Sequence, residues 1–265
     1  MNKFCLLLLC SFFSSWLYAQ DFALKQLENS PRHHEWVEVQ SNGRSIHSFV
    51  AYPEKSENAL AVIVIHENRG LTDWVRSFAD QMAAAGYLAI APDLLSGFND
   101  QYDKTSEFPS SDAAREAIYQ LDPQQVTQDL QAVQRYVADL PASSSKVAVM
   151  GFCWGGSQTF RYATLSQDIV AALVFYGTAP DDYAELAKIE APVYGFYGED
   201  DQRVNATIEG TAQMMKKAKN TYEYEIYSGA GHAFMRRGDD PEGGEANKDA
   251  KTQSLERIKS ILSQY

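Results

Sequence analysis

The sequence predicts an α/β fold: one doubly wound, mainly parallel sheet with an antiparallel hairpin at its N-terminal edge. Short apolar runs alternate with segments of helical periodicity, the pattern of parallel strands joined by helices. Several runs, such as residues 61–65 and 171–176, are apolar without interruption, as strands buried on both faces are. Near the N-terminus, Asn42-Gly43 separates two short strand-like segments, which is a strong hairpin signal.

The elements follow in chain order. Residues 20–34 read as a flexible lead-in, and Asn42-Gly43 turns the hairpin. Strands are predicted over residues 36–39, 46–51, 61–65, 87–91, 147–150, 171–176, 193–197 and 222–227. Helices are predicted over residues 73–85, 123–140, 157–162, 183–188, 206–218 and 246–262. Gly86 ends the first helix and Pro123 opens the second. Residues 94–122 are polar and irregular, with a short helical piece around residues 112–119, and we expect them to cap a pocket.

Length and charge limit the function. The chain has 265 residues, which suits one α/β domain with a full hydrophobic core. Its 35 acidic and 23 basic side chains give a net charge of −12, which argues against a nucleic-acid partner. His33, His34 and His47 lack the spacing of a metal site, and no metal or organic cofactor is implied. We expect a monomer.

Residues 1–19 have the pattern of a secretory signal peptide. Lys3 gives a short basic start, residues 4–17 are mostly apolar, and Ala19 is a small residue suited to cleavage. The alternative is a membrane anchor, but the apolar run is shorter than the ~18 residues that a spanning helix requires. We therefore expect an exported protein, periplasmic or secreted, with residues 20–265 as a single domain and no membrane association after cleavage.

The segment Gly151-Phe152-Cys153-Trp154-Gly155-Gly156 joins a predicted strand directly to a predicted helix. Glycines on both sides of the central residue allow the sharp turn of a nucleophile elbow. A helix N-terminus favours an anion, and therefore a thiolate at Cys153. The alternative is a buried structural cysteine. Because Cys5 and Cys10 lie in the signal segment, Cys153 is the one thiol of the mature chain and forms no internal disulfide, which favours the functional interpretation.

Two later strand ends carry possible partners of this thiol. The carboxylates Glu199, Asp200 and Asp201 follow one predicted strand, and His232 lies on a glycine-rich turn after the next. Loops beyond the carboxyl ends of such strands gather at one edge of the sheet. The chain order of nucleophile, acid and histidine is that of the α/β-hydrolase triad. A loop histidine without a catalytic role remains the alternative for His232.

The chemistry assigns a role to each residue. Cys153 attacks a carbonyl carbon, His232 transfers the proton, and a carboxylate fixes the tautomer of the imidazole. Asp201 is favoured over its two acidic neighbours because it lies a little farther beyond the strand end. The oxyanion donors are expected to be the backbone N–H groups of Trp154 and Asn68.

Together these motifs resemble the dienelactone hydrolase family. The matching motifs are His66-Glu67-Asn68-Arg69-Gly70, Ala91-Pro92-Asp93, Gly151-Phe152-Cys153-Trp154-Gly155-Gly156, Gly198-Glu199-Asp200-Asp201 and Gly231-His232-Ala233-Phe234. The resemblance covers about residues 35–264 and implies an α/β-hydrolase fold with a triad of Cys153, Asp201 and His232. It also implies that Glu67 holds the resting thiol and accepts its proton when substrate binds. The alternative for Glu67 is an ion pair with Arg69.

Family members that open dienelactones bind the substrate carboxylate with two arginines and a tyrosine. Arg236, four residues after His232, matches one arginine, and Arg115 and Tyr119 are candidates for the other arginine and the tyrosine. A guanidinium suits a planar carboxylate through paired hydrogen bonds. The alternative for Arg115 is a solvated helix residue.

The sequence therefore predicts a hydrolase of a small ester or lactone, with or without a carboxylate, that works through a thioester acyl-enzyme at Cys153. One alternative is a small-molecule binding protein on the same scaffold, without turnover. A thiol redox protein is the weakest alternative, because it would need a second cysteine nearby.

Overall fold

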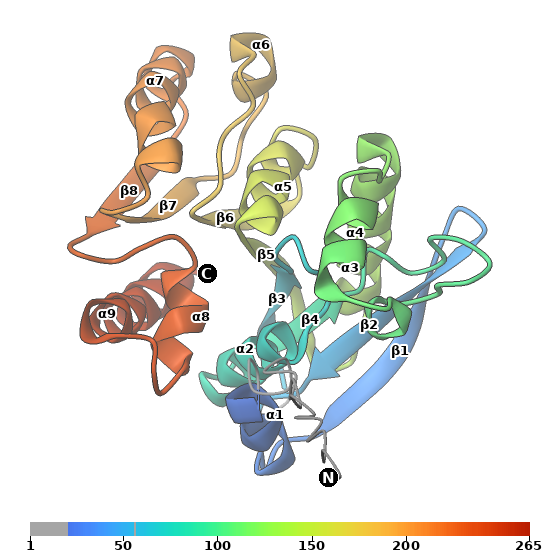
Figure 1. The fold of residues 1–265 in the computed structure, drawn as a ribbon. Helices are drawn as coiled ribbons and strands as arrows, with labels where there is room; N and C mark the ends of the chain where they lie inside the picture. Colours follow the sequence, from blue (N-terminus) through green and yellow to red (C-terminus); the bar gives the residue numbers. More distant parts are fainter. Residues whose placement is uncertain (1–20, 56) are drawn as a thin grey trace, which may run out of the picture.

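The computed structural model describes residues 21–55 and 57–265, so the predicted signal peptide lies outside the described residues. Within them, one eight-stranded sheet has the order β1-β2-β4-β3-β5-β6-β7-β8 (Figure 1). The strands are β1 (His34–Ser41), β2 (Arg44–Ala51), β3 (Ala59–Ile65), β4 (Leu88–Pro92), β5 (Ser143–Phe152), β6 (Ile169–Phe175), β7 (Val193–Gly198) and β8 (Tyr222–Tyr227).

The sheet is mainly parallel, as predicted. Strands β3 to β8 pair in parallel, whereas β1 with β2 and β2 with β4 are antiparallel. The hairpin turns at Asn42-Gly43, where both residues have positive φ, and Ser41 pairs with Arg44. This confirms the predicted α/β fold with an N-terminal hairpin.

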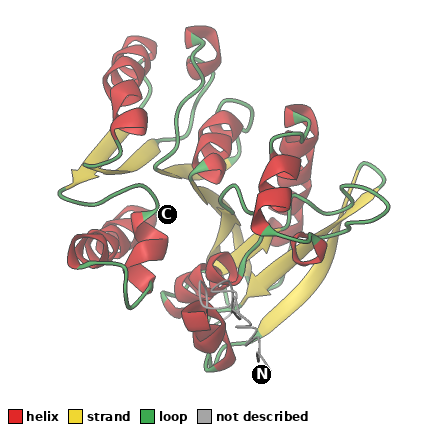
Figure 2. Cartoon of the chain, viewed as in Figure 1, coloured by secondary structure: helices red, strands yellow, loops and turns green. Residues whose placement is uncertain are grey.

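Helices cover both faces of the sheet (Figures 1 and 2). One face packs against α1 (Asp21–Glu28), α2 (Asp73–Ala84), α8 (Phe234–Asp239) and α9 (Glu245–Leu262). The other packs against α4 (Pro123–Ala138), α5 (Trp154–Ala163), α6 (Tyr183–Leu186) and α7 (Gln202–Ala218).

Strand β3 illustrates why its sequence is uniformly apolar. Val62 and Val64 point into the first layer, and Ile63 and Ile65 point into the second, all with no exposed surface. Each such side chain contributes roughly 1.5–3 kcal/mol on burial. The central strands therefore hold the loops at their carboxyl ends in fixed positions.

The flexible lead-in predicted for residues 20–34 is wrong, because α1 lies within it. Ala23 and Leu27, one helical turn apart, are buried in the layer that also holds α2. Beyond α1, Arg32 forms an ion pair of 2.6 Å with Asp80, a carboxylate of α2 that is fully buried. A polar composition concealed this element, since the partner of Arg32 is far away in the sequence.

The predicted cap, residues 94–122, is mostly loop and contains a 3-10 turn, Thr105–Glu107, and α3 (Ser111–Ile118). Ser110 caps α3 by accepting a hydrogen bond from the N–H of Ala113 over 3.1 Å. Helix α8 was not predicted from the sequence. Among the helices that the structure describes, none is long and apolar enough to cross a bilayer.

Candidate active site

The turn from β5 into α5 places Cys153 at the tip of an elbow. Cys153 has φ 56° and ψ −114°, and its N–H donates to the carbonyl of Phe175 over 3.0 Å. A Cβ on Gly156 would lie 2.5 Å from that same carbonyl oxygen, so only glycine allows α5 to approach β6 this closely. The thiol is free and partly exposed. The backbone therefore presents the sulfur above the sheet in a strained conformation.

His232 and Asp201 meet beside this elbow. Nδ1 of the imidazole lies 2.5 Å from Oδ2 of Asp201, which is almost fully buried. Burial raises the pKa of Asp201, but the hydrogen bond to His232 helps to bring it below its ordinary value. Burial lowers the pKa of His232, whereas hydrogen bonds to Asp201 and Cys153 raise it to about 9. Asp201 thus fixes the imidazole of His232, whose charged form is favoured.

The other two candidate acids point elsewhere. Glu199 accepts hydrogen bonds from the hydroxyl of Ser228 and the N–H of Gly229, over 2.9 and 2.8 Å. Asp200 is exposed. Asp201 is favoured by the fold because it is the N-cap of α7, where its side chain accepts from the first turn of the helix. Of the three carboxylates, Asp201 is therefore the one that contacts His232.

A cavity of about 390 Å³ opens over the thiol. Its lining comes from the loops that follow β3, β6 and β8, from the elbow and first turn of α5, from the first turn of α7, and from the cap. The lining residues are Asn68, Tyr119, Cys153, Trp154, Ser157, Tyr176, Thr178, Arg203 and His232. Five of the residues singled out from the sequence therefore line one cavity. Asp201 is not part of the lining but forms a hydrogen bond with His232.

The two residues predicted to supply the oxyanion donors, Trp154 and Asn68, line the cavity over the sulfur. Trp154 is the first residue of α5, so its N–H has no acceptor within that helix. Its indole stacks on the buried imidazole of His66, with ring centroids 5.4 Å apart. Asn68 lines the cavity, and its side-chain amide donates to the hydroxyl of Tyr119 over 3.1 Å. Tyr119 therefore belongs to the cavity wall contributed by the cap.

Glu67 and Arg236 form an ion pair with each other. Arg236 donates from Nε to Oε2 of Glu67 over 2.7 Å, and among the contacts of the described residues Glu67 forms its ion pair with Arg236 and none with Arg69. Arg115 lies on α3 in an exposed ion pair with Asp112, at 3.4 Å. Neither Arg236 nor Arg115 is among the residues that line the cavity.

Four lining residues were not identified as site residues from the sequence: Ser157, Tyr176, Thr178 and Arg203. Arg203 lies two residues beyond Asp201, and its exposed guanidinium makes no hydrogen bond or ion pair with the residues that the structure describes. Its place on the same strand-end segment as the acid was a usable signal. Tyr176 was counted within an apolar strand, but it is the first residue past β6 and has φ 41°.

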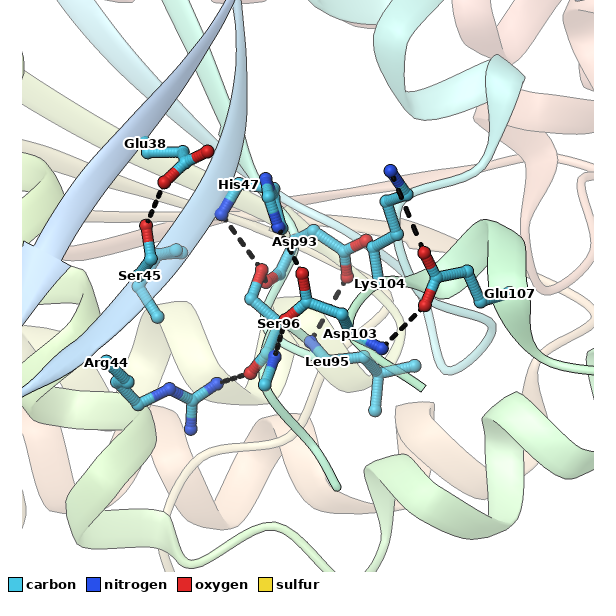
Figure 3. A network of polar contacts seen from close by, with 12 residues as sticks. Glu38, Arg44, Ser45, His47, Asp93, Leu95, Ser96, Asp103, Lys104 and Glu107 are labelled. Atoms are coloured by element: carbon cyan, nitrogen blue, oxygen red, sulfur yellow. Dashed lines mark hydrogen bonds and ion pairs between the residues drawn. The ribbon is translucent and has the colours of Figure 1, made fainter. Parts of the chain in front are cut away.

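A polar network fastens the cap to the sheet (Figure 3). His47 of β2 lies 2.7 Å, from Nε2 to Oδ2, from Asp103, and its N–H donates to the hydroxyl of Ser96 over 2.9 Å. The carboxylate of Asp93, at the end of β4, accepts from both the N–H and the hydroxyl of Thr105 over 2.7 Å. These contacts fix the start of the segment that carries Tyr119 to the cavity. Within residues 21–55 and 57–265, no cluster of three or more His, Cys, Asp or Glu side chains is arranged to hold a metal ion.

The doubly wound sheet, the strand-to-helix elbow and the strand-end loops around its cavity define the α/β-hydrolase class. A model of the dienelactone hydrolase family matches residues 46–265, and the chain belongs to that family.

Known proteins agree with this assignment. A candidate carboxymethylenebutenolidase of Saccharolobus solfataricus is 30% identical over 251 residues, which cover 84% of this chain and 95% of that protein. One of Escherichia coli is 29% identical over 210 residues, covering 75% and 76%. The crystal structure of a candidate dienelactone hydrolase from Klebsiella pneumoniae superposes with a TM-score of 0.77 at 26% identity, covering 88% and 99%. The chain is thus a hydrolase of small esters or lactones.

Proposed function

We propose that the chain hydrolyses its substrate through a triad of Cys153, His232 and Asp201 and a thioester acyl-enzyme. The observation that supports this most directly is the imidazole of His232, which lies 2.5 Å from Asp201 and lines the same cavity as Cys153, whose side chain raises the pKa of His232. A thiol beside a charged imidazole at a helix N-terminus is the setting in which cysteine becomes nucleophilic.

The reaction divides into two halves. The sulfur of Cys153 bonds to the acyl carbon, and the oxyanion accepts from the N–H of Trp154 and from an N–H of Asn68. His232 gives its proton to the oxygen of the leaving group as the C–O bond breaks, which leaves a thioester on Cys153. His232 then takes a proton from water, whose oxygen attacks the thioester, and the acid is released with the thiol restored. Asp201 holds the imidazole in one tautomer throughout.

For Glu67 we propose the role that the family resemblance implies: it holds the resting thiol and accepts its proton when substrate arrives. Two observations support this role: the Glu67 carboxylate is nearly buried and held by Arg236 over 2.7 Å, and the next residue, Asn68, lines the cavity over Cys153. Arg236 then positions the acceptor of the proton and does not itself hold substrate.

We further propose that the substrate can carry a carboxylate, received by Arg203. The two arginines expected for this task are engaged with carboxylates of the chain, Arg236 with Glu67 and Arg115 with Asp112. Arg203 lines the cavity and has no such partner among the described residues. Tyr119, also in the lining, remains a candidate for the same anion.

The test of the triad is direct. Wild type, Cys153→Ala and Cys153→Ser are assayed on p-nitrophenyl esters and dienelactones, with folding checked by circular dichroism. Mass spectrometry measures the mass of any acyl-enzyme intermediate that accumulates. We expect Cys153→Ala to lose turnover and the acyl adduct together. Full activity in that variant would refute the proposal. Binding of these compounds by wild type without turnover of any of them would instead favour the non-catalytic alternative.

We also propose, from the sequence, that the mature protein is exported and monomeric. Cell fractionation, N-terminal sequencing and light scattering test this. A mature chain that begins at Gln20 in the periplasm or the medium is expected, and a cytoplasmic chain that retains residues 1–19 would contradict it.

A further inference from the structure

Tyr176 carries a buried hydroxyl that the mechanism above does not use. Its side chain is 1% exposed, and the hydroxyl has no hydrogen-bond partner among the residues that the structure describes. Because an unpaired buried polar group costs free energy, such groups are rare in folded proteins. Tyr176 is also among the residues that line the cavity over Cys153.

Tyr176 has a backbone conformation that tyrosine rarely adopts. Its φ of 41° lies in the left-handed region, which an aromatic residue seldom adopts. Its N–H is fixed by the carbonyl of Phe196 over 2.9 Å. The next residue, Gly177, packs so closely on Gly156 that a Cβ there would overlap the backbone of α5. Strain and an unpaired hydroxyl at one residue beside the nucleophile indicate a function for that hydroxyl.

Aromatic contacts fix the position of the Tyr176 ring. It meets the imidazole of His232 edge-on, with centroids 5.0 Å apart, and the ring of Phe234 in the same manner at 5.3 Å. Burial raises the pKa of Tyr176 well above its ordinary value, and the charge of Glu67 adds to this effect. The hydroxyl therefore keeps its proton and is a hydrogen-bond donor.

The order of the strands fixes which side of the substrate Tyr176 faces. β3 and β6 flank β5, so Asn68 follows the strand on one side of Cys153 and Tyr176 the strand on the other. His232 and Asp201 follow β8 and β7, on the Tyr176 side. In acyl transfer the oxyanion points to its N–H donors, and the leaving group points to the histidine.

We propose that the Tyr176 hydroxyl donates a hydrogen bond to the leaving-group oxygen of the ester or lactone. This inference rests on the proposed triad, in which His232 protonates that oxygen. Tyr176 transfers no proton: it stabilises the negative charge that grows on the oxygen as the C–O bond breaks. An alkoxide or phenolate that is a poor leaving group accumulates more charge and depends more on this donor.

The experiment compares Tyr176→Phe with wild type on phenyl acetate and on p-nitrophenyl acetate, which share the acyl group. The expected kcat/KM falls about tenfold for phenyl acetate, because one hydrogen bond to a developing charge is lost, and less than about threefold for p-nitrophenyl acetate. Tyr227→Phe is the matched control, since Tyr227 is buried against Phe234 but does not line the cavity. It should match wild type on both esters.

Two further readouts separate the possible failures. The Tm of Tyr176→Phe should equal or exceed that of wild type, because the substitution removes an unpaired buried hydroxyl and keeps the ring. Equal losses on both esters, or no loss on either, would overturn the role of Tyr176 while Cys153→Ala still tests the triad. If Cys153→Ala keeps full activity, the proposed triad fails and the role of Tyr176 fails with it.

Discussion

Arg236 donates a hydrogen bond of 2.7 Å from Nε to Oε2 of Glu67 and so ties helix α8 to the loop that follows β3. Glu67 is 6% exposed. Burial lowers the pKa of Arg236, but the charge and the hydrogen bond of Glu67 raise it above its ordinary value. Each of the two charges therefore compensates for the cost of burying the other.

Breaking this pair should destabilise the fold. Arg236→Ala is expected to lower the free energy of unfolding by about 3 kcal/mol, because it leaves the Glu67 carboxylate buried and unpaired. The double variant Glu67→Gln/Arg236→Ala should recover part of that loss, since glutamine carries no charge. Urea unfolding of the wild type, both single variants and the double variant gives the coupling energy. Strictly additive losses would show that the two side chains act independently.

The three proposed triad residues could be placed from the sequence because each depends on local signals. Glycines around Cys153 mark the elbow. The apolar run before Asp201 and the alternating segment Tyr222–Tyr227 before His232 mark strands whose ends share one edge of the sheet. Local patterns also distinguish the N-terminal hairpin, through Asn42-Gly43. The arrangement of layers then follows from the alternation of strands and helices.

The contacts of the arginines could not be predicted in the same way. Arg236 and Glu67 are 169 residues apart, and their contact depends on where α8 packs, a helix that sequence periodicity did not indicate. Likewise, nothing in an apolar run distinguishes Tyr176, whose hydroxyl faces a cavity, from a tyrosine that only packs. The partners of buried polar groups are set by tertiary structure, which a local pattern does not contain.

Close packing at the elbow makes a second prediction. Gly156→Ala should destabilise strongly or prevent folding, because its Cβ would lie 2.5 Å from the carbonyl oxygen of Phe175, a backbone atom held within the sheet. Gly210→Ala is the matched control, in the middle of α7 with open space around it, and should stabilise by roughly 0.5–1 kcal/mol. Thermal unfolding of both variants tests this, and a well-folded Gly156→Ala protein would show that α5 can move away from β6.

The protonation of His232 should couple stability to pH. Its pKa rises from the ordinary 6.5 to about 9 in the folded chain, where burial opposes and the contacts with Asp201 and Cys153 favour the charged form. Protonated His232 therefore stabilises the folded chain, and this stabilisation is complete at a pH below about 6.5. It is lost as the pH rises through about 9. Urea unfolding at both ends of this interval should show a smaller decline for His232→Gln than for wild type. Identical declines would mean that other groups account for the dependence.

Arg203 should determine the preference for anionic substrates. Arg203→Ala is expected to lower kcat/KM about tenfold for p-nitrophenyl hemisuccinate, through loss of a charge-assisted hydrogen bond, and to leave the neutral p-nitrophenyl pentanoate unchanged. Added salt should weaken the wild-type preference and leave the variant unaffected, because the guanidinium is exposed and screened. Arg115→Ala is the matched control, since Arg115 is another exposed arginine of the chain, outside the cavity lining and paired with Asp112. Equal losses on both esters in Arg203→Ala, or a larger effect of Arg115→Ala, would place the anion elsewhere in the cavity.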